Sequence, residues 1–357
     1  MEWKLSDEQD AYSRTLREWL ADVAPAGAVR LWLDEADAGT FEKRIAADGW
    51  SGVGIPEEAG GQGGGLVELA LTSEELARAA APSAAWLATV LAIPALAGRA
   101  ELVERALAQE PIALLTAADL VPGEMPGLVL DADGSVNGTV DRVLAGDRAH
   151  SFVVVVQQDG GRSLRLVDRQ AVGVTITPRR LLDRSRSVAD VRLESVASEP
   201  LEVDADAYLA GCAARAAVLT AADSLGATER MLDLAVEYSK QRHQFGVPIG
   251  SFQAVKHAAA TILVGVEAAR SVVYFAAASV DSDAPDAALH AAAAKAQVTA
   301  EGARAADGAL TIHGAIGYTW EYDLQIFYKR AKLDEHLYGD PQVWNERIAD
   351  GLVLTGP

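Results

Sequence analysis

The chain has 357 residues, half of them hydrophobic, and its formal net charge is −20. This length is enough for two or three packed units with a sizeable core. The excess of acidic residues argues against a nucleic-acid partner, because phosphates would be repelled rather than neutralised, and it provides no basic belt for an anionic membrane surface.

The single cysteine, Cys212, excludes an internal disulfide and a multi-cysteine metal site. It lies among small apolar residues, so we expect a buried structural thiol rather than a nucleophile. No basic segment followed by an apolar one suggests a signal peptide, and no apolar run reaches the about 18 residues of a membrane span. We therefore expect a cytoplasmic protein.

Residues 1–110 are predicted to form an α-helical N-terminal domain. Ser6 and Gln9 have the spacing of a capping box, and apolar residues follow at helical intervals. The glycine-rich segment at residues 49–65 does not follow a strand and open a helix, as a dinucleotide-binding loop would. A flexible connection between helices is the expected structure there.

Residues 111–203 are predicted to form a middle antiparallel β domain. Short runs rich in Val, Leu and Ile alternate with Asp-Gly, Asn-Gly and Gly-Gly pairs, which favour tight turns between strands.

Residues 204–357 return to long alanine-rich helical patterns, and so many small residues predict closely packed neighbours, most simply a four-helix bundle. Ser251 is the expected N-cap of the second long helix. Apolar residues run around that helix at 272–275, which fits either an oligomer interface or burial within one subunit.

Two motifs in the C-terminal region carry a specific resemblance. The segment Gln241–His257 reads QRHQFGVPIGSFQAVKH, and Ile312–Lys332 reads IHGAIGYTWEYDLQIFYKRAK. In order and spacing they resemble the acyl-CoA dehydrogenase family, and within it the heteromeric actinobacterial subgroup that acts on steroid or branched acyl-CoA. The order helical, β, helical agrees with that resemblance over nearly the whole chain.

The resemblance implies both a fold and a reaction. Family members have a helical N-terminal domain, a middle β domain and a C-terminal four-helix bundle, and they bind FAD at dimer interfaces. They oxidise the Cα–Cβ bond of an acyl-CoA to an enoyl-CoA: a carboxylate takes the α-proton and the flavin takes the β-hydrogen as hydride. The resemblance also implies an electron-transfer flavoprotein as the electron acceptor.

The first motif implies a cofactor contact. By resemblance, Arg242 faces the pyrophosphate of the neighbouring subunit's FAD, with Gln244 and Phe245 beside it, and a guanidinium suits that charge. Gly246 and Pro248 set the turn that presents these side chains. The alternative for Arg242 is an ordinary cation at the negative end of a helix.

The second motif implies further cofactor contacts. Gly314 and Gly317 would allow the backbone to approach the cofactor closely, or they simply form a tight turn between helices. Ala315 replaces the usual second glycine of the family, and Thr311 replaces a glutamine that often meets the adenine.

Neither usual position of the catalytic base holds a carboxylate. By resemblance, Tyr338 occupies the common glutamate position, and a phenol is a weak base at neutral pH. Ala216 occupies the alternative position on the first bundle helix. Asp334, Glu335 and Asp340 lie nearby as weak candidates, although a solvated helix end is the more ordinary role for them.

The middle domain departs from the family as well. The loop that binds the flavin ring and substrate is recognisable only at Thr116, in the segment ALLTAADLVPGEMPG. The chain thus keeps the part of a flavin site that a subunit lends to its neighbour and has lost much of the part that it would use itself.

Three readings of the function follow. In the first, the chain is the base-lacking subunit of a heteromeric acyl-CoA dehydrogenase, completed by a second subunit of the same family. In the second, it is a self-sufficient homotetramer whose base is one of the displaced carboxylates. In the third, it is a flavin-free scaffold subunit on the same fold.

Overall fold

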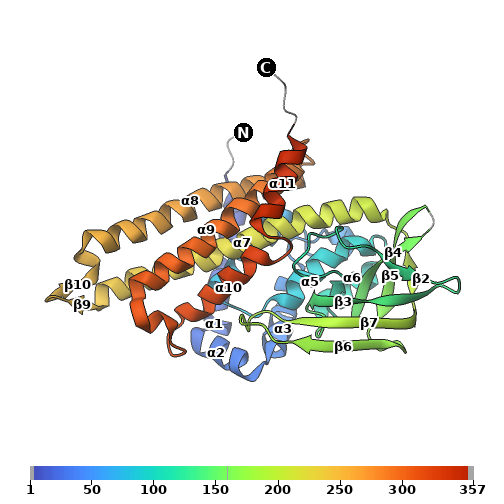
Figure 1. Ribbon diagram of the computed structural model, residues 1–357, viewed down its shortest axis with the longest axis horizontal. Helices are drawn as coiled ribbons and strands as arrows, with labels where there is room; N and C mark the ends of the chain where they lie inside the picture. The colour runs from blue at the N-terminus through green and yellow to red at the C-terminus, as the bar shows by residue number, and fades with distance from the viewer. Residues whose placement is uncertain (1–3, 159, 353–357) are drawn as a thin grey trace, which may run out of the picture. The chain divides into compact units, whose positions relative to one another are not determined.

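The computed structural model describes residues 4–158 and 160–352 (Figure 1). The chain divides into two compact units. Unit 1 contains the described residues up to Arg30, together with Ala70–Ala81 and the chain from Ala217 onward; unit 2 contains Leu31–Leu69 and Pro82–Ala216. Because this division combines segments distant in sequence, the three ranges 1–110, 111–203 and 204–357 stay a prediction.

Unit 1 is helical. Helices α2 (Ala26–Glu35), α4 (Leu66–Arg78) and α7 (Ala205–Gln241) belong to it only in part. Its other elements are α1 (Asp7–Val23), β9 (His243–Gln244), β10 (Val247–Pro248), η4 (Ile249–Ser251), α8 (Gln253–Asp281), α9 (Ala287–His313), η5 (Gly314–Tyr318), α10 (Leu324–His336) and α11 (Pro341–Gly351). Figure 1 shows α8 and α9 side by side, and contacts between them agree.

The predicted start of α1 is confirmed, and that of α8 is corrected. The Ser6 side chain accepts from the Gln9 N–H at 3.1 Å, and the Gln9 side chain accepts from the Ser6 N–H at 3.0 Å. Helix α8 begins at Gln253 without a side-chain cap. Ser251 instead donates its hydroxyl to the carbonyl of Pro248, because it lies inside the 3₁₀ turn before the helix.

Glycines set the closest helix contacts of unit 1. A Cβ at Gly226 of α7 would overlap the Glu74 carbonyl oxygen of α4, and one at Gly302 of α9 would overlap the Ser224 hydroxyl of α7. Close packing of the alanine-rich helices therefore rests on missing side chains at these crossings.

A buried ion pair joins α10 to α7. Arg330 and Asp223 are both buried, and the guanidinium donates to the two carboxylate oxygens at 2.7 Å each. Arg330 also donates to the Ala81 carbonyl at 3.0 Å. Two-point geometry and mutual charge make this pairing strong, and removing one partner would leave an uncompensated buried charge.

Helix α8 is buried at one end and exposed at the other. Val273 and Tyr274 are buried within the chain, so this part of the predicted apolar belt is core. The exposed apolar residues lie nearer the start of the helix, at Leu263 and Val264. By length and composition alone α8 could cross a membrane, contrary to the sequence-based expectation; one such helix is weak support, because core helices pass the same test.

Unit 2 contains a sheet and several shorter helices. Its elements are α3 (Ala38–Ala47), η1 (Trp50–Gly52), η2 (Glu57–Ala59), α5 (Ala84–Ala92), η3 (Ile93–Leu96), α6 (Ala100–Ala108), β1 (Ile112–Leu114), β2 (Leu128–Leu130), β3 (Ser135–Leu144), β4 (Ser151–Gln158), β5 (Gly161–Asp168), β6 (Val174–Arg179), β7 (Val188–Ala197) and β8 (Glu199–Leu201). The strand order is β6-β7-β3-β2-β4-β5-β8, with β1 also paired to β4.

The predicted β domain is confirmed, but its sheet is mixed rather than purely antiparallel. Both β1 and β2 pair with β4 in parallel, with Ile112 opposite Ser151 and Leu128 opposite Val156. Turn residues reveal only neighbouring hairpins, whereas parallel pairing requires a longer crossover. The apolar run of β4, including Phe152, is buried at successive positions, as expected for a strand covered on both faces.

The glycine-rich segment folds back on itself. The Gly54 N–H donates to the Gly63 carbonyl at 2.8 Å, and the Gly63 N–H donates to the Ile55 carbonyl at 2.8 Å. A Cβ at Gly61 would overlap the Ile55 backbone. The segment is therefore a packed loop rather than the expected flexible connection.

Burial confirms the interpretation of Cys212. The thiol lies on α7 and is buried. Burial raises the pKa of the Cys212 thiol to about 12, so the reactive thiolate is not formed near neutral pH.

Two glycines on α7 make a matched test of the packing. We expect Gly226→Ala to lower the free energy of unfolding by about 2 kcal/mol or more, because the new methyl group meets the Glu74 backbone. Gly211 has no atom near its virtual Cβ, so Gly211→Ala should raise stability by about 0.5–1 kcal/mol through helix propensity. Urea denaturation followed by circular dichroism measures both; equal effects would contradict the packing argument.

Candidate functional site

The first motif forms a tight hairpin directly after α7. Val247 pairs with Gln244, so Phe245 and Gly246 are the two turn residues. Both have positive φ, 53° and 82°, as a two-residue hairpin of the primed type requires. The turn leaves Phe245 92% exposed.

The polar side chains of the hairpin point away from the fold. Arg242 and Gln244 are exposed, and no hydrogen bond or ion pair of either side chain occurs among residues 4–158 and 160–352. The Arg242 N–H donates to the Tyr238 carbonyl at 2.8 Å, and the Arg242 carbonyl accepts from the Ile249 N–H at 2.8 Å. The backbone is thus held at both groups while the guanidinium stays available to a ligand or a second chain.

A buried histidine anchors the second motif. His313 Nδ1 lies 2.7 Å from the Ala309 carbonyl, which fixes it as the donor, and Nε2 lies 3.2 Å from the Tyr322 hydroxyl. The ring stacks on Tyr238 at 4.8 Å. Burial lowers the pKa of His313, so the neutral ring holds the end of α9 in place.

The two glycines of this motif have different roles. Gly314 has a φ of 64° and open space around its virtual Cβ, which suits close approach of a ligand. A Cβ at Gly317 would lie 2.8 Å from Leu310 Cδ1 and 3.0 Å from Leu324 Cδ2, so packing within the chain already favours a glycine there. Ala315 and Thr311 are exposed, and Thr311 donates its hydroxyl to the Asp307 carbonyl at 2.8 Å.

In unit 2, Thr116 follows strand β1. It is buried, and its hydroxyl oxygen has no hydrogen-bond partner in the described part of the chain. A buried hydroxyl without a partner is costly and calls for an explanation. A bound polar group would satisfy it.

These residues fit FAD. The exposed Arg242 guanidinium, which has no partner among the described residues, suits a pyrophosphate, and the open Gly314 suits close approach of a ligand. The Thr116 hydroxyl, also without a partner in the described part of the chain, suits a polar group of the cofactor. The first two lie in unit 1 and the third in unit 2.

Both expected positions of the base are closed and lack a carboxylate. Tyr338 is buried with a φ of 57°, and its carbonyl accepts from the Trp344 indole N–H at 2.9 Å. Ala216 is fully buried on α7. The next acidic residue along that helix, Asp223, is already paired with Arg330.

The three nearby carboxylates have structural surroundings. Asp340 caps α11 by accepting from the backbone N–H groups of Gln342 and Val343 at 2.9 and 3.0 Å. Glu335 is half-buried. Asp334 is fully buried, so the expectation of a solvated helix end is wrong for it, because α10 packs that face against the rest of unit 1.

A buried lysine organises this segment. The Lys295 ammonium on α9 donates to the carbonyls of Asp334, Glu335 and Gly339 at 3.0, 3.2 and 2.8 Å. These carbonyls close the C-terminal end of α10, where a cation is favourable. Burial lowers the pKa of Lys295 to about 7, against the opposing attraction of Asp334, Asp340 and Glu335.

The sequence reasoning missed Lys295, His313 and the Asp223–Arg330 pair. A single lysine inside an alanine run was the available signal for Lys295, since a lone charge on an apolar face requires a specific partner. Nothing local in the sequence connects Asp223 with Arg330.

The pKa of Lys295 predicts a pH dependence of stability. The unfolded chain keeps this proton up to about its ordinary pKa of 10.5, whereas the folded chain releases it near 7. The unfolded state therefore binds more protons between these values, and folding becomes more favourable as the pH rises. We expect the unfolding free energy of the wild type minus that of Lys295→Met to increase from pH 7 to pH 10 in urea titrations. A difference that does not change with pH would contradict the lowered pKa.

Two family models match the chain. The model for the acyl-CoA dehydrogenase N-terminal domain matches residues 6–109, and that for the C-terminal domain matches residues 208–353. The acyl-CoA dehydrogenase IpdE2 of Mycobacterium tuberculosis (strain ATCC 25618 / H37Rv) is 36% identical over 342 residues, which cover 94% of each chain.

Solved structures agree with this match. The Tcur3481-Tcur3483 steroid ACAD G363A variant is 26% identical with a TM-score of 0.87, over 96% of this chain and 97% of that chain. The ChsE4-ChsE5 complex from Mycobacterium tuberculosis is 25% identical with a TM-score of 0.87, over the full length of both chains. Sequence, fold and motif geometry together show that the chain belongs to the acyl-CoA dehydrogenase family.

Proposed function

We propose that this chain is the base-lacking subunit of a heteromeric, FAD-dependent acyl-CoA dehydrogenase. It lends Arg242, Gln244 and Phe245 to a flavin held largely by a second subunit of the same family. The proton acceptor comes from that second subunit.

The observation that carries the proposal is that no carboxylate occupies either position where the family holds its catalytic base. Tyr338 and Ala216 offer no carboxylate and are buried. Asp340 is committed to a helix cap, and Asp334 is buried in the segment that Lys295 holds. A self-sufficient enzyme could use Asp340 only by releasing its helix cap and Asp334 only by exposing a fully buried carboxylate, which leaves the half-buried Glu335 as the displaced candidate.

The reaction divides between the subunits in this proposal. FAD, when bound, accepts the β-hydrogen of the acyl group as a hydride. Arg242 balances the negative charge of the pyrophosphate, and Phe245 covers apolar surface beside it. The α-proton leaves to a carboxylate of the partner, so the acyl chain loses one proton and one hydride and gains a double bond.

An exposed apolar surface supports a second subunit. It consists of Phe245, Val247, Phe252, Leu263 and Val264, and we call it the hairpin–α8 surface. Isolated exposed apolar residues are ordinary, but the centroids of the exposed Phe245 and Phe252 rings lie 6.1 Å apart, and neighbouring exposed aromatic rings favour a protein interface. This surface also adjoins Arg242 along the chain, as a shared cofactor site would require.

The substrate and partners follow from similar proteins. Among the similar structures, one is described as a steroid ACAD and another as a two-chain complex. We therefore propose a polycyclic or branched acyl-CoA as the substrate, a second acyl-CoA dehydrogenase-like chain as the partner, an electron-transfer flavoprotein as the electron acceptor, and the cytoplasm as the location.

Co-purification tests the heteromer. We expect this chain alone to bind little flavin and to form no enoyl-CoA, because it lacks a base. Co-expressed with a second acyl-CoA dehydrogenase-like chain that supplies the base, it should form a complex of equal stoichiometry with a flavin absorption band and turnover. Full flavin and turnover in the lone chain would reject the proposal, and a flavin-free complex would favour a scaffold.

The cofactor role of Arg242 has a separate test. In the complex, Arg242→Gln should lower the flavin content without changing subunit stoichiometry, because the pyrophosphate loses its charged partner. Arg304→Gln is the matched control, since Arg304 is an exposed arginine paired only with Glu301 of its own helix in the described contacts. Flavin content per complex measures both variants, and unchanged flavin in Arg242→Gln would remove this residue from the site.

A further inference from the structure

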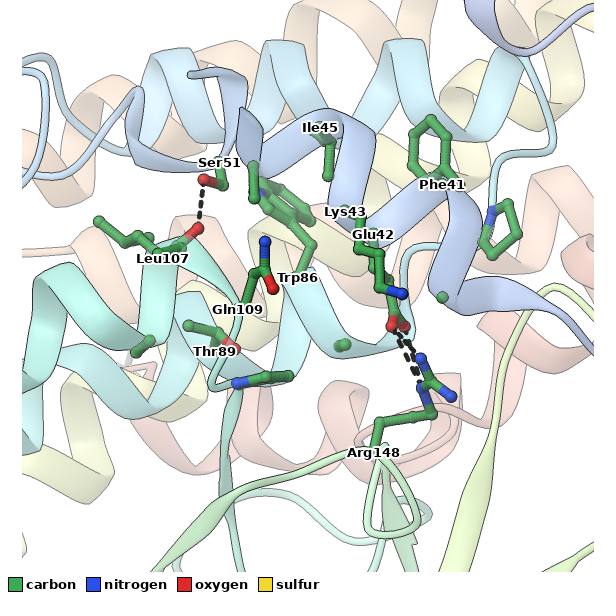
Figure 2. A pocket seen from close by; sticks show the side chains of 17 residues that line it. Phe41, Glu42, Lys43, Ile45, Ser51, Trp86, Thr89, Leu107, Gln109 and Arg148 are labelled. Carbon is green, nitrogen blue, oxygen red and sulfur yellow. Dashed lines mark hydrogen bonds and ion pairs between the residues drawn. The ribbon is translucent and has the colours of Figure 1, made fainter. Parts of the chain in front are cut away.

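A cavity in unit 2 lies apart from the positions considered so far. Its volume is about 150 Å³, and it lies between α3, α5 and the end of α6 (Figure 2). All its lining residues belong to unit 2, and they include none of the proposed flavin or base positions.

The inner wall of the cavity is apolar. Phe41 and Ile45 of α3 face it together with Ala85 and Ala106, and these residues are buried. Three charged residues also line it: Arg148 donates to the Glu42 carboxylate at 3.1 Å, as the dashed lines in Figure 2 show, and Lys43 is exposed to solvent. The wall therefore favours a neutral occupant over an ion.

Two hydrogen-bond donors lie on one face of α5 beside the cavity. Trp86 is 7% exposed, and its indole N–H has no acceptor among the residues that the structure describes. Thr89 is 4% exposed; its oxygen accepts from the Ile112 N–H at 3.2 Å, which leaves its own hydroxyl hydrogen for a second bond. Residues three apart on a helix share a face, so both donors can serve one acceptor.

A buried donor without a partner costs about 1–3 kcal/mol. An apolar cavity of about this volume accepts a benzene-sized guest, whereas an ordered water needs two to four polar partners. The combination favours a guest with an apolar body and one oxygen acceptor.

We propose that this cavity binds a small neutral molecule, a ring or chain of about six to eight non-hydrogen atoms by comparison with benzene, that presents a carbonyl oxygen to Trp86 and Thr89. The apolar body packs against Phe41 and Ile45. None of the proposed flavin or base residues lines this cavity, and all the residues that line it come from this chain.

Cyclohexanone and methylenecyclohexane are matched probes, because they share size and shape and only the ketone carries an oxygen. With the full-length chain, ligand-observed NMR titration should show the ketone binding about three- to ten-fold more tightly, the usual effect of one net hydrogen bond. In Trp86→Phe the ketone should lose most of this preference while methylenecyclohexane keeps its affinity, as in a double-mutant cycle.

Two alanines of α3 locate the site. Ala46 lines the cavity and Ala47 is exposed beside it, outside the lining. Ala46→Leu should abolish binding of both probes, and Ala47→Leu should leave it unchanged; both variants remain informative if Trp86→Phe does not fold. The proposal would be overturned if the wild type bound both probes equally well or did not bind the ketone. It would also be overturned if Trp86→Phe kept the ketone preference, or if either probe still bound to Ala46→Leu.

Discussion

The buried pair of Arg330 and Asp223 is the constraint on which much of unit 1 depends. It joins α10 to α7 through two hydrogen bonds and reaches the segment after α4 through the Ala81 carbonyl. Neither charge has access to water, so neither helix can shift without exposing an unpaired ion. Gly226 and Gly302 let α4 and α9 approach α7 closely at neighbouring crossings.

This constraint extends to the segment where the family carries its base. The segment follows α10 directly, and Lys295 holds its carbonyls from the adjacent helix α9. Tyr338 is therefore in a rigid, buried place, and Asp340 already caps the next helix. The position that lacks a carboxylate is therefore tightly packed. For this reason we assign proton removal to another subunit. By contrast, the hairpin that carries Arg242 is exposed and free to meet a partner.

Parts of the candidate site differ in how far sequence could predict them. The turn at Gly246 was predicted from the motif, but its other residue is Phe245 rather than Pro248, which pairs with His243 in β10. Two expectations were wrong: a solvated helix end at Asp334 and a flexible loop at residues 49–65. Both depend on what packs against the segment, which the local sequence does not specify. Gly317 likewise has a packing role that no motif reveals.

The sequence alone determined the helical and β regions, the capping box at Ser6, the family motifs and the absence of an acid at Tyr338 and Ala216. These features depend on residue identity and on periodicity within a few turns of chain. Only the tertiary structure decided the parallel pairing of β1 and β2 with β4, the burial of Lys295 and Asp334, the Arg330–Asp223 pair and the cavity beside Trp86. Each of these joins residues far apart in the chain, and the cost of burying a charge or donor is set by neighbours that local sequence does not specify.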